Sequence, residues 1–105
     1  MPQTHRQFWG RQQGRCILNH NWDAIDHDSV VLVTASEYVL TPNPQDEHPF
    51  IGNANVTVCN IAPHGPPYDP NHGVTFVVNV DWQSPLYIVT DITVLDEKPE
   101  WVGGR

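Results

Sequence analysis

Charge is scarce in this sequence, and positive charge is scarcest. Only 16% of the 105 residues are Asp, Glu, Lys or Arg, against about a quarter in typical soluble domains. Twelve acidic residues stand against five basic ones, so the formal net charge is −7, and Lys98 is the single lysine. Because nucleic acids and anionic membrane surfaces are bound through clustered Lys and Arg, we expect neither as a partner.

Long apolar runs are also missing. No stretch approaches the roughly 18 apolar residues of a membrane-spanning helix, and residues 1–6 lack the apolar core of a secretory signal. We therefore expect no membrane segment and favour the cytoplasm as the compartment. Cys16 and Cys59 are the only cysteines and form no CxxC pair, so free thiols are expected rather than a disulfide.

The usual catalytic signatures are absent as well. The sequence has no GxSxG elbow, no glycine-rich phosphate loop and no HExxH helix. Its one lysine lies in the C-terminal segment, away from any expected pocket. A non-enzymatic protein is the main expectation, and a small histidine- or metal-dependent enzyme is the minor alternative.

The sequence is rich in apolar and polar residues that alternate with a period of two. Residues 73–83 show this best, because Val74, Phe76 and Val78 alternate with Thr75 and Asn79. Such alternation is typical of a strand with one buried face. Further strands, separated by Pro, Gly, Asn and Asp, are predicted at 15–19, 29–40, 51–62 and 86–95, with an edge piece at 7–9.

One buried face per strand requires two packed sheets or one closed sheet. We predict one all-β domain, an antiparallel β-sandwich of immunoglobulin-like or jelly-roll-like architecture with about six or seven strands. No helix longer than about two turns is expected. The short link at 83–85 predicts a hairpin between the last two strands. Residues 1–6 and 97–105 are predicted to be tails, loosely held or held by a partner, and the proline-rich segment 41–50 to be a solvated loop.

Two loops gather most of the ionisable side chains. Strands that alternate in direction place loops 20–28 and 63–73 at the same end of the molecule, and these loops carry four of the six histidines. Imidazole groups are ligands for divalent transition metals. The predicted metal ligands are His20, His27, His64 and His72. Turn chemistry is the competing interpretation, because Asp, Asn, His and Gly are also common turn residues.

The same end carries an aromatic and polar set. Trp22 and Tyr68 lie near Asp23 and Asp69 in the sequence. Aromatic rings that stack on a sugar, beside carboxylates that bond its hydroxyls, form a plausible glycan or small-ligand site. Apart from a divalent metal, no cofactor is expected.

The function class that fits best is a non-enzymatic binding or assembly module, either a homo-oligomer or a structural subunit. Phe8, Trp9 and Trp101 lie in segments with few other core-forming residues. Large aromatics are costly to leave in water, so these three favour contact with a second copy or a protein partner. A glycan- or metal-binding module that uses loops 20–28 and 63–73 is the alternative.

Overall fold

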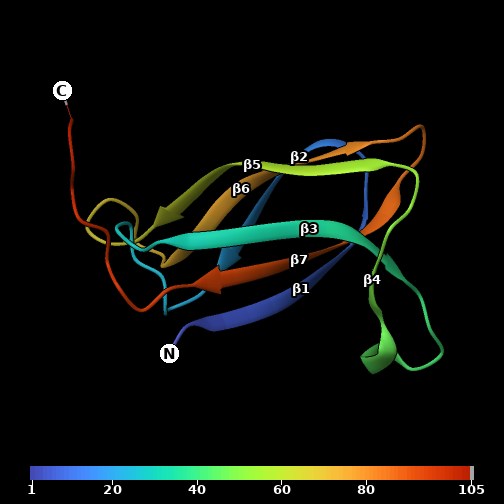
Figure 1. The fold of residues 1–105 in the computed structure, drawn as a ribbon, viewed down its shortest axis with the longest axis horizontal. Coiled ribbons are helices and arrows are strands. Elements are labelled where there is room, and N and C mark those ends of the chain that lie inside the picture. Colours follow the sequence, from blue (N-terminus) through green and yellow to red (C-terminus); the bar gives the residue numbers. More distant parts are fainter. Residues whose placement is uncertain (105) are drawn as a thin grey trace.

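The computed structural model describes residues 1–104 and shows an all-β chain (Figure 1). The strands are β1 (Gln3–Gln12), β2 (Gly14–Asn21), β3 (Val31–Val39), β4 (His48–Phe50), β5 (Asn55–His64), β6 (Gly73–Asp81) and β7 (Leu86–Val94). Within the described residues the only helical element is the 3-10 turn η1 (Pro44–Asp46). The predictions of an all-β chain and of no long helix are confirmed there. No helix in this part of the chain has the length and apolar character needed to cross a membrane.

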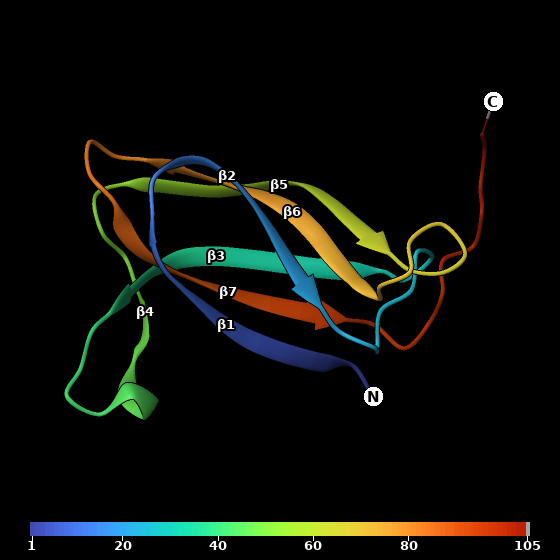
Figure 2. The same ribbon diagram turned by 180° about the vertical axis from the view of Figure 1, so that it is seen from behind.

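The seven strands form two antiparallel sheets (Figures 1 and 2). The first sheet has the order β1-β7-β3-β4 and the second the order β2-β6-β5. The predicted hairpin between β6 and β7 is wrong, because these strands lie in different sheets. The chain leaves β6 at Asp81 and bends at residues 82–84. A short link between strands therefore does not fix their pairing, since it can also cross from one sheet to the other.

Both sheets contribute to one apolar core. On β6, Val74, Phe76 and Val78 are fully buried, whereas Thr75 and Asn79 are only partly covered. The alternation predicted for this strand is therefore confirmed. The core also contains Val80 of β6, Ile25 and, from the other strands, Val31, Val33, Ile88, Ile92 and Val94.

The N-terminal segment is a strand and not the predicted tail. β1 pairs with β7 from Gln3 to Gln12. Polar cross-strand contacts hold its first half: the Arg6 guanidinium donates to both carboxylate oxygens of Asp91, and the hydroxyls of Thr4 and Thr93 are 2.8 Å apart. Such pairs stabilise a sheet without the apolar alternation on which the sequence prediction relied.

The two aromatics of β1 are used inside the chain. Trp9 donates its indole N–H to Thr90 Oγ1 at 2.8 Å, and its ring meets Phe76 edge-on at 6.0 Å. Phe8 points to the opposite face, where its ring lies 4.8 Å from Tyr38. The expectation that Phe8 and Trp9 dock on a partner is therefore corrected, because both pack against their own domain. Trp101 differs, since it is 79% exposed.

Segment 41–50, predicted as a solvated loop, contains a 3-10 turn and a short strand. Asn43 caps η1 by accepting a hydrogen bond from the Gln45 N–H, and β4 pairs with the end of β3 at Glu37, Tyr38 and Val39. The prolines that indicated a loop are compatible with this short strand because β4 is an edge strand.

Candidate functional site

The two histidine-bearing loops lie at the same end of the molecule and touch (Figure 1). The Trp22 N–H donates to the carbonyl oxygen of His72 at 2.8 Å. In return, Nδ1 of His72 donates to the carbonyl oxygen of Ile25 and lies 2.9 Å from Asp26 Oδ1. The side chain of Ile25 is fully buried beneath these contacts. The loops are therefore joined by backbone and side-chain hydrogen bonds.

The four histidines predicted as metal ligands are engaged by different partners. His20 bonds to His5, His64 to Asn19, and His72 to the Ile25 carbonyl group, while His27 packs edge-on against Tyr68. Within residues 1–104, no group of three or more His, Cys, Asp or Glu side chains is arranged to hold a metal ion. The loops meet, but their histidines do not converge on one point.

His64 belongs to a polar network on the outer side of the second sheet. Its Nε2 lies 2.7 Å from Asn19 Oδ1, which also accepts a hydrogen bond from the Thr75 hydroxyl at 2.9 Å. Its Nδ1 lies 2.7 Å from the Asn71 carbonyl oxygen. Asp69 accepts from the Asn71 N–H at 2.8 Å, which is the turn chemistry that competes with a ligand role.

His5 forms a cluster with His20 and Trp22 that the sequence did not reveal. His5 Nδ1 and His20 Nε2 are 2.9 Å apart, so one ring nitrogen donates a hydrogen bond and the other accepts it. The His5 ring stacks on Trp22 with centroids 3.6 Å apart. Because β1 and β2 belong to different sheets, this cluster links the two sheets. Burial and, secondarily, the nearby His5 lower the pKa of His20.

We expect the His20 pKa shift to make stability depend on pH. Near and below pH 6.5, His20 takes up a proton more readily in the unfolded chain than in the folded one. The contribution of neutral His20 to the free energy of unfolding is therefore fully present above this pH. It is lost as the pH falls through the lower pKa of the folded state. Urea unfolding of wild type and His20→Gln from pH 7.5 to 5 should show a flatter profile for the variant. His48→Gln, at an exposed histidine of β4, is the control, and equal flattening there would contradict the assignment.

The predicted glycan-contacting residues make contacts with different neighbours. Trp22 makes its aromatic contacts with His5 and His20, whereas Tyr68 contacts His27 and is 79% exposed. Asp23 is exposed, and Asp69 is occupied by its turn. Of this set, Tyr68 and Asp23 are therefore the side chains most open to a ligand.

Lys98 ties the C-terminal segment to the first loop. Its Nζ donates to Asp28 Oδ1 at 2.7 Å and to Asp26 Oδ2 at 3.2 Å. The hydrogen bond to Asp28 raises the pKa of Lys98, and the same bond lowers the pKa of Asp28. The single lysine thus has a structural partner, and residues 97–104 of the predicted tail 97–105 are held at this point, whereas residue 105 lies outside the described residues.

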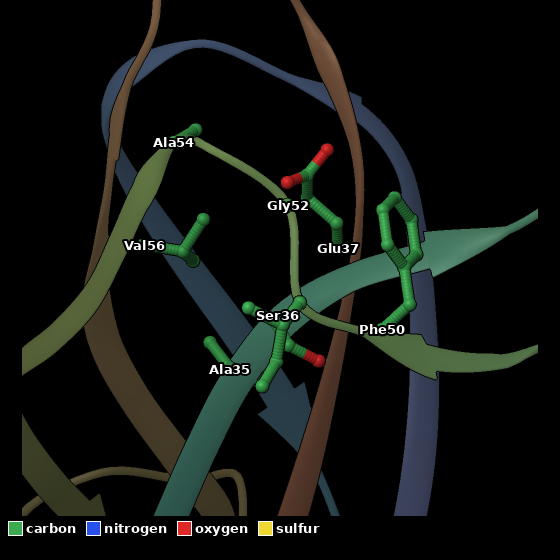
Figure 3. A pocket seen from close by; sticks show the side chains of 8 residues that line it. Ala35, Ser36, Glu37, Phe50, Gly52, Ala54 and Val56 are labelled. Atoms are coloured by element: carbon green, nitrogen blue, oxygen red, sulfur yellow. The ribbon is translucent and has the colours of Figure 1, made fainter.

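The opposite end of the molecule has a small cavity that the sequence did not indicate. About 160 Å³ of space lies between β3 and β5, next to the segment that leaves β4 (Figure 3). Ala35, Phe50 and Val56 are among its apolar lining residues, and the Glu37 carboxylate is its one charged group. Gly52 faces that carboxylate so closely that a Cβ atom there would overlap it. Its lining residues come from two separate segments, 35–37 and 50–56, which no local pattern brings together.

Comparisons with known proteins give no relative for this chain. It matches no family model, no curated protein and no solved structure. Inferences about its function must therefore rest on its own geometry and chemistry.

Proposed function

We propose that the protein is a non-enzymatic assembly module, a β-sandwich whose copies associate with one another. The sandwich is supported by the shared core, to which strands of both sheets contribute. The assembly role is supported by one observation: large apolar side chains face water at ordered positions in both sheets. Ile17 of β2 is 64% exposed and Leu32 of β3 is 54% exposed, and Ile51, in the link between β4 and β5, is 99% exposed. Exposed apolar surface of this kind favours association with another protein surface.

The polar groups also favour a binding role over catalysis. A general base needs a free nitrogen or oxygen near a substrate position. His64 and His72 instead have ring nitrogens bonded to backbone carbonyl groups, and the Lys98 ammonium group is bonded to two carboxylates. These side chains serve the fold.

The proposal predicts that the mass in solution rises with protein concentration. Light scattering at about 10 μM should give a mass near the 11.9 kDa of one chain, and at about 1 mM a mass well above it, as is typical of weak interfaces. Because the interactions are apolar, added salt should not reverse the increase. A constant mass of one chain across this range would contradict the proposal.

A glycan- or metal-binding module at loops 20–28 and 63–73 is the alternative, and a small metal-dependent enzyme ranks behind it. The contact between the loops supports a shared site. However, Trp22 and Tyr68 contact different aromatic rings, and the four histidines have different partners. Both the glycan-binding and the metal-binding function are therefore less well supported than assembly.

A further inference from the structure

The outer face of the second sheet has an apolar centre where a solvated face is normally polar. We refer to this surface of β2, β6 and β5 as the β6 face. Ile17 of β2 and Cys59 of β5 lie on either side of Val77 in the strand register. Val77 is only 4% exposed, whereas Ile17 is 64% exposed and Ile61, two residues after Cys59 in the irregular part of β5, is 37% exposed. Both cysteines are free, and Cys59 is exposed.

The polar side chains of the β6 face bond mainly to one another. Asn19 accepts from the Thr75 hydroxyl, contacts His64, and donates to Asn21 at 2.8 Å. On the other side of the apolar centre, Asn79 donates to Cys59 Sγ at 3.6 Å. Burying a polar group is costly when its hydrogen bonds to water are not replaced. Because these groups already have partners, covering the face costs less than covering an ordinary polar surface.

Charge on the β6 face is balanced, although the whole chain is strongly acidic. The residues that alternate outward on the three strands include one cation, Arg15, and one anion, Asp81. Both line a hollow of about 230 Å³ at one end of the face. The ion pairs found within residues 1–104 include neither of them. Two copies with a net charge of −7 each can therefore meet here without direct repulsion.

We propose that the β6 face binds the same face of a second copy, related by a two-fold axis that runs along β6 near Val77. A two-fold interface must be self-complementary. This axis places Ile17 over Cys59 of the second copy and Val77 over its own equivalent. It also brings the same end of both faces together, so that Arg15 reaches toward Asp81 of the second copy. The two-fold rotation therefore places the apolar residues Ile17, Val77 and Cys59 against apolar residues, and Arg15 near an opposite charge.

The area of the β6 face determines how tightly we expect the two copies to bind. Three strands about 4.8 Å apart, with about eight residues at 3.4 Å each, cover roughly 400 Å² per copy. Stable interfaces bury about 800 Å² per partner. The dimer is therefore weak and transient, with a dissociation constant of roughly 100 μM or above.

The inference rests on the proposed self-association and is tested by locating the interface. In sedimentation equilibrium, Ile17→Arg should raise the dissociation constant about tenfold or more, since it buries two unpaired charges. Leu32→Arg, at a similarly exposed leucine of β3 in the other sheet, should change it less than about twofold. Circular dichroism verifies that the variants are folded. Thr57→Arg on β5 is a second substitution on the β6 face and should also raise the dissociation constant.

A charge swap tests the orientation of the two copies. Arg15→Asp and Asp81→Arg should each weaken the dimer, and the double variant should restore it to within about twofold of wild type. If Ile17→Arg and Thr57→Arg leave the dissociation constant unchanged, or if Leu32→Arg raises it equally, the β6 face is not the interface. Self-association itself would not be contradicted by that result. Failure of the double variant to restore binding overturns the two-fold arrangement. A wild-type chain that never dimerises removes both proposals.

Discussion

Val78→Ala is expected to lower the free energy of unfolding by about 2–3 kcal/mol, and Thr75→Ala by less than about 1 kcal/mol. Val78 is fully buried in the middle strand of its sheet, between Cys16 of β2 and Val58 of β5 in the register. Removing its two methyl groups leaves a cavity that both sheets enclose. Thr75 lies on the opposite face of the same strand and is partly exposed. Its hydroxyl bonds to an asparagine that keeps a second partner, His64.

Urea unfolding of both variants at pH 7.5 measures this difference. The dependence on urea should be unchanged in slope, so that the shift in midpoint reports stability alone. Because the two positions share one strand and one pair of neighbouring strands, the backbone context is matched. Equal losses for Val78→Ala and Thr75→Ala would show that the assignment of the two faces is wrong.

The fold could be predicted where one face of a strand is apolar. Alternation located β6 because Val74, Phe76 and Val78 enter the core while Thr75 and Asn79 do not. The same rule missed most of β1, whose first half is held by polar cross-strand pairs. It also says nothing about which strand lies beside which. The sheet order β2-β6-β5 separates β6 from β7, although they follow one another in the sequence.

The position of the candidate site was predictable, but its chemistry was not. Strand direction alone brings the two loops together, and the His72 contacts with Ile25 and Asp26 show that they meet. Which nitrogen faces which oxygen depends on side-chain geometry that spacing does not encode. His5, which is 15 residues from His20 in the sequence, is the clearest example. It enters the cluster only because β1 and β2 lie at corresponding edges of different sheets.

Gly73→Ala is expected to lower the free energy of unfolding by about 2–3 kcal/mol or more, because the two closest atoms that the added methyl group meets belong to the backbone of β2. Gly73 pairs with Asn21 on β2 and with His64 on β5. A Cβ atom there would overlap the His20 carbonyl oxygen, and would lie 2.8 Å from Asn21 Cα and 3.0 Å from His64 Cε1. Relief requires β2 to move away from β6. That movement would disturb Trp22, whose N–H bonds to the His72 carbonyl oxygen.

Gly52→Ala is the matched control, because the same change there meets only the flexible end of Glu37. The Glu37 carboxylate can swing into the adjoining cavity of about 160 Å³, so a loss below about 1 kcal/mol is expected. Thermal and urea unfolding of the two variants compare the stability cost of a clash with backbone atoms, at Gly73, with that of a clash with a flexible side chain, at Gly52. Equal stability of both variants would mean that β2 and β6 tolerate a side chain between them. In that case, the close approach of the strands at Gly73 would not explain why glycine occupies this position.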